Sequence, residues 1–312
     1  MNEATATWWI LGVVAISGVN FGVVKQVSEV FDNPTLLTGR FLVAAACLGP
    51  WLFNAPKKVT SGGLESGAWL AAGYIAQAVS LAGGTPSSIC SFFASLSCIV
   101  CPFIEQFLGV RLDRKAWVAA ALAIAGAGVL ELGGGTLPTQ DDLIALLQPL
   151  FFGIYLIRTE DAMKNHPKEA MAITALQLAA VSGIAAVWGV AEGFHSGLMD
   201  QAHVTSWLQN FAAHPAESAE LVYMGIGPSA MALAIETVVL AKLSSSKTAL
   251  LFSTEPVWAA VFGASFLGES IGANVMVGGV LATTACLVRS ISTKSMIRTY
   301  RTLEEKLTKK EA

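Results

Sequence analysis

The sequence has few charged residues, few histidines and no pattern of catalytic or phosphate-binding residues. Only 13% of its 312 residues are Asp, Glu, Lys or Arg, about half of the ~25% found in soluble domains. The formal net charge is −3 and no basic face exists outside the C-terminal tail, which excludes nucleic acid as a partner. The segment LGGGTLP (132–138) lacks the Lys-Ser/Thr of a phosphate loop, and the four histidines fall in loops. The sequence therefore gives no support to an enzyme.

Cysteine is also scarce, and its placement excludes a disulfide framework. The five cysteines lie inside apolar runs, at positions 47, 90, 98, 101 and 286, so we expect free thiols. The pair in CIVC (98–101) has no histidine or second cysteine pair nearby, so we expect no metal and no cofactor. No basic stretch precedes the first apolar run at Trp8, and we therefore expect no cleavable signal peptide.

Long apolar runs dominate what is present. Hydrophobic residues make up 54% of the chain, and a helix needs about 20 mostly apolar residues to cross a bilayer. Ten segments meet this requirement, so the sequence predicts an all-α integral membrane protein with ten transmembrane helices. Their predicted limits are 7–28, 33–53, 66–83, 86–108, 115–133, 142–159, 169–190, 217–240, 247–267 and 271–290.

The distribution of Lys and Arg supports the count of ten. With ten spans, both termini share one side of the membrane with the loops that follow spans two, four, six and eight. Of the 19 Lys and Arg residues, all except Lys25 and Arg40 fall on that side. Cytoplasmic loops are enriched in these residues, so we expect both termini on the cytoplasmic side. The last residues, KKEA, would suit the endoplasmic reticulum of a eukaryote.

The two halves of the chain resemble one another at an offset of 159 residues. FLGVRL (107–112) aligns with FLGESI (266–271), and the small-residue segment 118–130 aligns with 277–288. Five spans per copy is an odd number, so the second copy enters the membrane from the opposite side, as in the inverted repeats of secondary transporters. We predict one repeat over 7–133, a second over 142–290, and a basic cytoplasmic tail over 291–312.

Four stretches, in order along the chain, resemble the drug/metabolite transporter superfamily, of the EamA-domain type. They are SGVNFGVVK (17–25), Arg40 in PTLLTGRFLVAA, SFFASLSCIVCPFIEQFLGVRL (91–112) and STEPVWAAVFGASFLGES (253–270). The resemblance implies a small-molecule transporter whose spans one to four and six to nine line a central cavity. Val110 stands where the family often has Glu, which removes a symmetric partner for Glu269.

Ionisable residues deep in a membrane usually face a cavity or a partner. Glu255, near the middle of span nine, and Arg40, in span two, are the deepest; Glu105, Glu131 and Glu236 lie nearer helix ends. Glu255 has two interpretations that can coexist. It is a cavity carboxylate that binds a cationic group or carries a proton, or it is a structural side chain that satisfies carbonyls freed by Pro256.

Other polar and aromatic residues at similar depth complete the candidate site. The substrate-binding candidates are Asn20, Arg40, Tyr74, Gln77, Ser97, Tyr155, Glu255 and Trp258, with Glu255 also the candidate for proton coupling. Helix–helix hydrogen bonding is the alternative role for most of them. Four prolines, Pro102, Pro149, Pro228 and Pro256, predict breaks inside the helices.

These features favour a secondary transporter that moves a small organic solute, amino acid-like or amphipathic, by alternating access through a central cavity. A translocator of sugar phosphates or nucleotide sugars and a non-transporting membrane scaffold of the same fold remain alternatives. The expected partners are a small solute and the lipid bilayer, and the sequence leaves a homodimer open.

Overall fold

The computed structural model describes residues 2–85, 87–107, 140–195, 211–266 and 272–290, together with residue 209 and scattered residues between 109 and 129. Every element in the five ranges is helical. The helices are α1 (Glu3–Val27), α2 (Asn33–Cys47), α3 (Gly49–Phe53), α4 (Lys57–Ala82), α5 (Ser87–Ser95), α6 (Ser97–Phe107), α8 (Gln140–Ala145), α9 (Gln148–Asn165), α10 (Ala170–His195), α12 (Pro215–Met224), the π-helix η1 (Gly225–Met231), α13 (Ala232–Leu240), α14 (Ser245–Phe252), α15 (Glu255–Phe266) and α16 (Ala273–Ser290).

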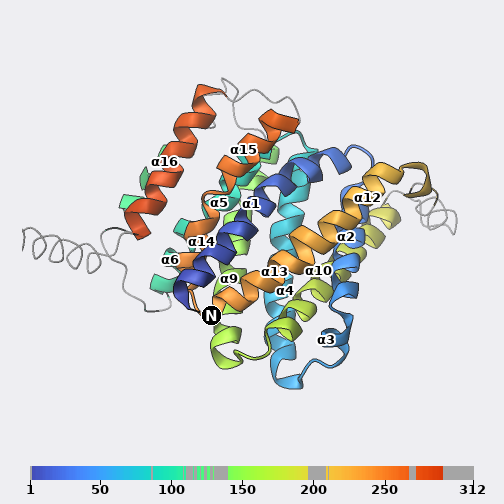
Figure 1. The fold of residues 1–312 in the computed structure, drawn as a ribbon. Coiled ribbons are helices and arrows are strands. Elements are labelled where there is room, and N and C mark those ends of the chain that lie inside the picture. Colours follow the sequence, from blue (N-terminus) through green and yellow to red (C-terminus); the bar gives the residue numbers. More distant parts are fainter. Residues whose placement is uncertain are drawn as a thin grey trace, which may run out of the picture.

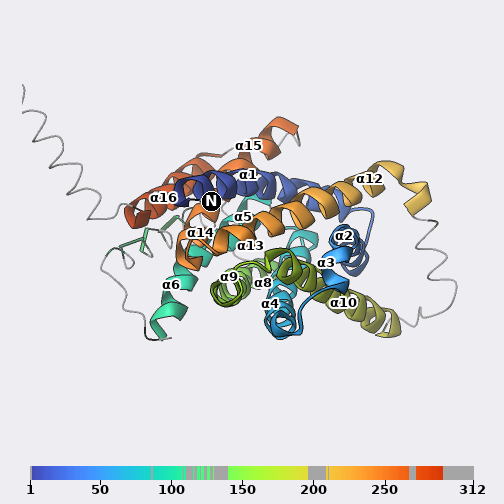
Figure 2. The ribbon, with the colours of Figure 1, turned by 60° about the horizontal axis from the view of Figure 1, so that its bottom comes forward.

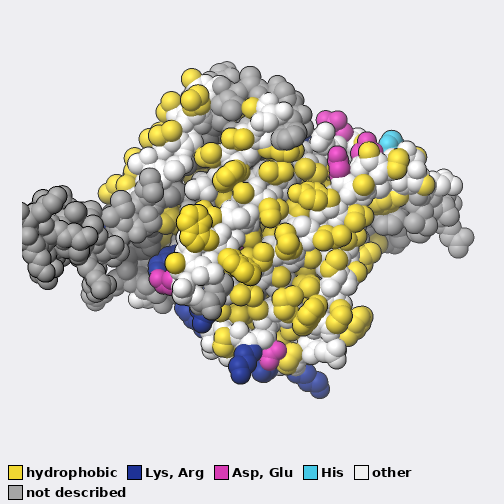
Figure 3. Space-filling view, in the orientation of Figure 1, with side chains coloured by type: hydrophobic (Ala, Val, Ile, Leu, Met, Phe, Trp, Pro, Cys, Tyr) yellow, Lys and Arg dark blue, Asp and Glu magenta, His cyan; other side chains and the backbone are white. Residues whose placement is uncertain are grey.

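The chain is an all-α integral, multi-pass membrane protein. Five stretches within the described residues are long and apolar enough to cross a bilayer: Glu3–Val27, Ile89–Phe107, Leu143–Asn165, Ala170–Ala191 and Pro215–Leu240. The face in Figure 3 is covered by hydrophobic side chains, and charged side chains gather at its two ends. Large apolar side chains such as Trp8, Phe53 and Phe107 are exposed on the surface. A surface of this kind suits contact with lipid.

Several predicted spans consist of two helices with a break between them. The predicted span 247–267 forms α14 and α15, which are separated by Ser253 and Thr254, and 86–108 forms α5 and α6, separated by Leu96. Span 217–240 contains the π-helix η1, a wider turn that forms around Pro228. The predicted span 66–83 instead begins at Lys57, because charged residues can occupy the helical turns that project beyond the hydrocarbon region.

Helices from the two halves of the sequence pack against one another. In both ribbon views α1, from the start of the chain, runs beside α13 and α15, from near its end (Figures 1 and 2). Helices α2 and α4 pack against α10, and α4 also packs against α9. One buried hydrophobic cluster accordingly contains residues of both halves, from Phe21 to Leu250.

The two broken spans lie side by side and antiparallel. Helix α5 packs against α15, while α6 packs against α14. The break at Leu96 therefore lies level with the break at Ser253 and Thr254. This arrangement places two interruptions of regular helix in the middle of the bundle, where neighbouring side chains must satisfy the freed backbone groups.

Close helix contacts in the interior depend on glycine and on one buried amide. A Cβ atom at Gly67 of α4 would lie 2.7 Å from Cα of Gln177 on α10, so no larger residue fits there without moving a backbone. The Gln177 side chain donates hydrogen bonds to Ser66 Oγ and Thr159 Oγ1, both at 2.9 Å. These contacts hold α4, α9 and α10 together without apolar bulk, as expected for helices that pack within a membrane.

Basic side chains gather at one end of the bundle. Ion pairs at that end join Lys58 to Glu169, Arg158 to Glu65, Lys164 to Glu160 and Lys247 to Glu3. The chain's N-terminus lies at the same end (Figure 1), and Figure 3 shows Lys and Arg there, with Asp, Glu and His but no basic residue visible at the opposite end. We call the first end the basic end. Most of the predicted span 115–133 and the whole tail 291–312 lie outside the described residues.

Candidate functional site

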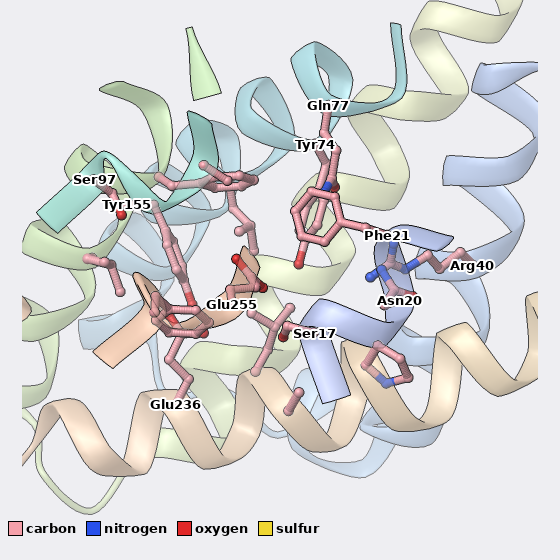
Figure 4. Close-up of a pocket in the computed structure, with 18 residues that line it drawn as sticks. Ser17, Asn20, Phe21, Arg40, Tyr74, Gln77, Ser97, Tyr155, Glu236 and Glu255 are labelled. Atoms are coloured by element: carbon pink, nitrogen blue, oxygen red, sulfur yellow. The ribbon is translucent and has the colours of Figure 1, made fainter. Parts of the chain in front are cut away.

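A cavity lies in the middle of the bundle and is lined by helices of both halves (Figure 4). It encloses about 660 Å³ of space between its lining atoms, part of which is open to the outside. Its walls mix aromatic and aliphatic side chains with a small number of polar groups, a composition typical of small-molecule sites. The lining residues are Ser17, Asn20, Phe21, Arg40, Leu70, Tyr74, Gln77, Ala94, Ser97, Phe152, Tyr155, Leu156, Pro228, Ala232, Leu233, Glu236, Phe252 and Glu255.

Arg40 supplies positive charge to one part of the cavity. Its side chain, which is 1% exposed, donates a hydrogen bond from Nε to Ser229 Oγ at 2.7 Å. The guanidinium carbon lies 5.0 Å from the ring centres of both Phe41 and Tyr74, a distance suited to cation–π contact. Within the described residues no carboxylate forms an ion pair with it. The guanidinium thus has N–H donors beyond the one that Ser229 accepts.

Two carboxyl groups supply negative charge or protons to another part of the same cavity. Glu236 of α13 and Glu255 of α15 are both buried, and their carboxyl groups are close enough to interact electrostatically. The Tyr155 and Glu236 side chains point toward one another in Figure 4. No described residue forms a hydrogen bond of ordinary geometry with the Tyr155 hydroxyl. Two buried carboxylates that line the same cavity repel when both are ionised, so the pair favours binding one proton or one cation.

Tyr74 lies between the basic and acidic parts of the cavity. Its ring stands between Arg40 and Glu255 in Figure 4, and its hydroxyl interacts electrostatically with Arg40, Glu236 and Glu255. The ring packs against Phe41 at 4.8 Å and against the edge of Phe152 at 5.4 Å between centres. Tyr74 is therefore held in place by two neighbouring rings and separates opposite charges within one cavity.

The break in span nine explains how Glu255 reaches the cavity. Hydroxyl groups of Ser253 and Thr254 donate to the carbonyls of Leu250 and Leu251, which also accept the backbone N–H groups of the same two residues in a tightened last turn. Glu255 is consequently the first residue of α15, and Pro256 follows in the first turn, where a missing N–H costs nothing. Ser253 and Thr254 thus bind the carbonyls of the last turn of α14, and the Glu255 side chain lines the cavity.

The second half of the chain matches a known family. Residues 141–291 match the model of the EamA-like transporter family. These residues are similar to EamA-like transporters, and the match confirms the resemblance drawn from the motifs. It supports a membrane transporter of the drug/metabolite type.

A solved structure shares the fold of the whole chain. A crystal structure of a protein superposes with a TM-score of 0.67 at 15% sequence identity, over 94% of this chain and 99% of the other. Identity this low establishes the fold alone. No curated protein matches the sequence.

Seven of the eight residues predicted to bind substrate line this cavity: Asn20, Arg40, Tyr74, Gln77, Ser97, Tyr155 and Glu255. Trp258 does not. It is 44% exposed, and the rotation of about 300° over three helical residues leaves it offset by about 60° from Glu255.

Sequence reasoning missed Glu236, which it placed near a helix end. The span that contains it runs for 26 residues, from Pro215 to Leu240, which is longer than a bilayer requires. Distance from the end of such a helix is a poor measure of depth. A buried glutamate four residues before the end of an apolar run is the signal that could have identified it.

The four prolines predicted to break helices differ in their effect on the structure. Pro228 lies in η1 and lines the cavity, while Pro256 and Pro149 lie in the first turns of α15 and α9. Helix α6 continues through Pro102, and its break from α5 is at Leu96 instead. Among the described residues, no group of three His, Cys, Asp or Glu side chains could hold a metal ion.

We predict that Ser229→Ala destabilises the protein by about 1.5–3 kcal/mol, because it removes a hydrogen bond to a buried charge. Ser80→Ala is the matched control, since the buried Ser80 hydroxyl has no hydrogen-bond partner in the described structure; this change is expected to be close to neutral. Thermal unfolding of the purified protein in detergent measures both. Equal losses in the two variants would contradict the role assigned to the Arg40–Ser229 bond.

Proposed function

We propose that this protein is a secondary transporter that moves a small organic solute through the central cavity by alternating access. The observation that carries the proposal is the cavity itself, in which a buried Arg40 and a buried pair of carboxyl groups, Glu236 and Glu255, stand on either side of Tyr74. Buried charges without ion-pair partners are costly in a membrane and are typical of sites that bind a substrate or an ion.

The charge arrangement favours a solute that carries both a negative and a positive group. A carboxylate on the solute would accept hydrogen bonds from the Arg40 guanidinium, which binds such groups in bidentate fashion. An ammonium group would lie against Glu236 or Glu255, and the aromatic walls at Phe21, Phe152 and Phe252 would contact an apolar side chain. We therefore propose an amino acid or a related amphipathic metabolite as the substrate.

A sugar phosphate or nucleotide sugar fits this cavity less well. Such a substrate carries two negative charges, and among the described residues that line the cavity Arg40 is the only cation, while Glu236 and Glu255 are acidic. A second buried carboxylate near a phosphate would repel it. This chemistry favours the zwitterionic class over the phosphorylated one.

The architecture that we propose for transport is ten spans in two inverted repeats, 7–133 and 142–290, with both termini at the basic end. Support comes from the broken helices α5–α6 and α14–α15, which occupy equivalent positions at the 159-residue offset and pack antiparallel. Enrichment of Lys and Arg at that end supports a cytoplasmic position for it. Two inverted repeats can exchange conformations and expose one site to each side in turn.

Counterflow in proteoliposomes tests the proposed substrate class. We expect exchange of labelled amino acids, and little exchange of nucleobases or sugar phosphates, because only the amino acids carry both charges that the cavity matches. Exchange of sugar phosphates alone would contradict the proposed substrate class but would still support the proposed transport function. Tight binding of a solute without any exchange would favour a receptor or scaffold of the same fold.

We further propose that Glu255 couples transport to protons. Glu255→Gln keeps the size of the side chain but cannot bind a proton, so we expect solute uptake to lose its response to an imposed pH gradient. Glu65→Gln is the control, because Glu65 is a surface carboxylate paired with Arg158. Uptake with and without the gradient is compared in each variant. If the gradient still drives uptake in Glu255→Gln, Glu255 is not the coupling residue.

Ten spans predict that the tail 291–312 and the segment 196–210 lie on opposite sides of the membrane. Single cysteines placed in each segment, in a variant whose native cysteines are replaced, report the side through a membrane-impermeant maleimide. We expect labelling of the tail from the cytoplasmic side and of the other segment from the opposite side. Labelling of both from one side would rule out the proposed topology.

A further inference from the structure

A set of hydrogen bonds joins α6, α9 and α14 at the basic end, outside the cavity. The Glu105 carboxylate accepts from Ser245 Oγ at 3.0 Å and from Ser246 Oγ at 2.7 Å. The Glu160 carboxylate accepts from the Ser245 backbone N–H at 2.6 Å, and its other oxygen pairs with Lys164 Nζ at 2.6 Å. We call Glu105, Glu160, Ser245 and Ser246 the polar latch.

The polar latch lies between the cavity and the basic end on helices that also line the cavity. Ser97 of α6, Tyr155 of α9 and Phe252 of α14 contribute to the cavity wall. On α6, Ser97, Cys101 and Glu105 follow at four-residue spacing and so share one face. Eight residues of helix, about 12 Å at ~1.5 Å per residue, separate Ser97 from Glu105.

The space between the cavity and the polar latch is filled by packed side chains. Cys101 is fully buried, and its Sγ donates to the Gly153 carbonyl of α9 at 3.7 Å. Thr248 and Ala249 of α14 are fully buried in the same region of the helix. A solute that moved from the cavity to the basic end between α6, α9 and α14 would have to separate these helices, and their separation would break the polar latch.

The opposite end has no equivalent carboxylate in its sequence. At the 159-residue offset Glu105 corresponds to Ala264 of α15, and Ser246 corresponds to Ser87, the first residue of α5. Helices α15 and α5 pack against each other as α6 and α14 do. Alanine has no side-chain acceptor, so the contact at this end cannot form the hydrogen bonds that Glu105 forms.

We propose that the polar latch is the gate of the basic end, and that its absence at the equivalent position makes the form closed at the basic end the resting state. The proposal rests on the alternating access proposed above, and it names the residues that set the relative populations of the two conformations. Hydrogen bonds to carboxylates stabilise one of two conformations, and their loss shifts the populations toward the other.

Helix α14 links this gate to the cavity. It begins at Ser245, inside the polar latch, and ends at Phe252, with Glu255 following after the two-residue break. A helix of eight residues moves as a rigid piece, and the break allows it to move relative to α15. Binding at Glu255 is thus placed to pull on Ser245 and Ser246 through one short helix.

Native Cys101 reports opening of the gate, because it is buried directly behind the polar latch. Sealed vesicles with the basic end outward are treated with a membrane-impermeant maleimide, and labelling of the Cys101 peptide is followed by mass spectrometry. We expect slow labelling in the native protein and a rise of about tenfold in Glu105→Gln and in the double variant Ser245→Ala/Ser246→Ala, because both weaken the closed form. Two independent variants guard against a folding defect in either one.

Glu3→Gln is the matched control. It removes the ion pair between Glu3 of α1 and Lys247, which lies on α14 as Ser245 and Ser246 do. This pair is also at the basic end, but it is exposed and lies outside the polar latch. We expect native labelling of Cys101 in this variant. An equal rise in Glu3→Gln, or no rise in either latch variant, would overturn the proposal.

A second reporter tests the resting state. A cysteine at Ser97, in the cavity wall, should react with the maleimide from the opposite end in a protein whose latch is intact, and more slowly from the basic end. Equal reaction from both ends would overturn the assigned resting state.

Neither labelling assay requires a substrate or measures flux, so the two proposals can fail separately. If Cys101 becomes accessible in the latch variants but no solute exchanges, the proposed gate is supported and the proposed transport function is contradicted. If solute exchanges but labelling of Cys101 is unchanged in the latch variants, the proposed gate is contradicted and the proposed transport function is supported.

Discussion

The burial of Arg40 is the constraint on which the middle of this bundle depends. A guanidinium cannot lie inside a membrane protein without hydrogen-bond acceptors or aromatic faces around it. Here Ser229 of η1 accepts its Nε hydrogen bond, and its guanidinium carbon lies over the rings of Phe41 and Tyr74. Helices α2 and α4 and the π-helix must therefore meet at one point, and the cavity forms beside it.

The π-helix η1 and Gly225 at its start both help to bring a hydrogen-bond acceptor to Arg40. A Cβ atom at Gly225 would lie 2.7 Å from Val43 and 2.8 Å from the Arg40 carbonyl, so glycine lets η1 approach α2 closely. The wider turn around Pro228 brings Ser229 within reach of Arg40. A regular helix here would place the hydroxyl elsewhere, since each inserted residue rotates the following side chains by about 100°.

Charge and helix breaks together give the molecule its functional organisation. The break at Ser253 and Thr254 is capped by their own hydroxyls, which leaves Glu255 for the cavity. The same break separates α14 from α15, so one short helix connects the cavity carboxyl group to the hydrogen bonds at the basic end. The interrupted span formed by α14 and α15 thus contributes both to the central cavity and to the polar latch at the basic end.

The sequence by itself determined the class of protein, the resemblance to a transporter family and seven of the residues in the cavity wall. These follow from properties that are local in the chain: apolar runs of membrane length, motifs at fixed spacing, and polar residues such as Asn20 and Glu255 placed far from any loop.

The tertiary structure decided the rest, because it depends on contacts between residues far apart in the chain. Glu236 belongs to the cavity although it lies near the end of its span, and Trp258 is outside although it lies three residues from Glu255. The position of Glu105 in the sequence predicts an interfacial side chain, yet its carboxylate accepts hydrogen bonds from Ser245 and Ser246, 140 and 141 residues away. Depth and facing direction depend on how helices tilt, break and pack, and one-dimensional hydropathy carries no information on these.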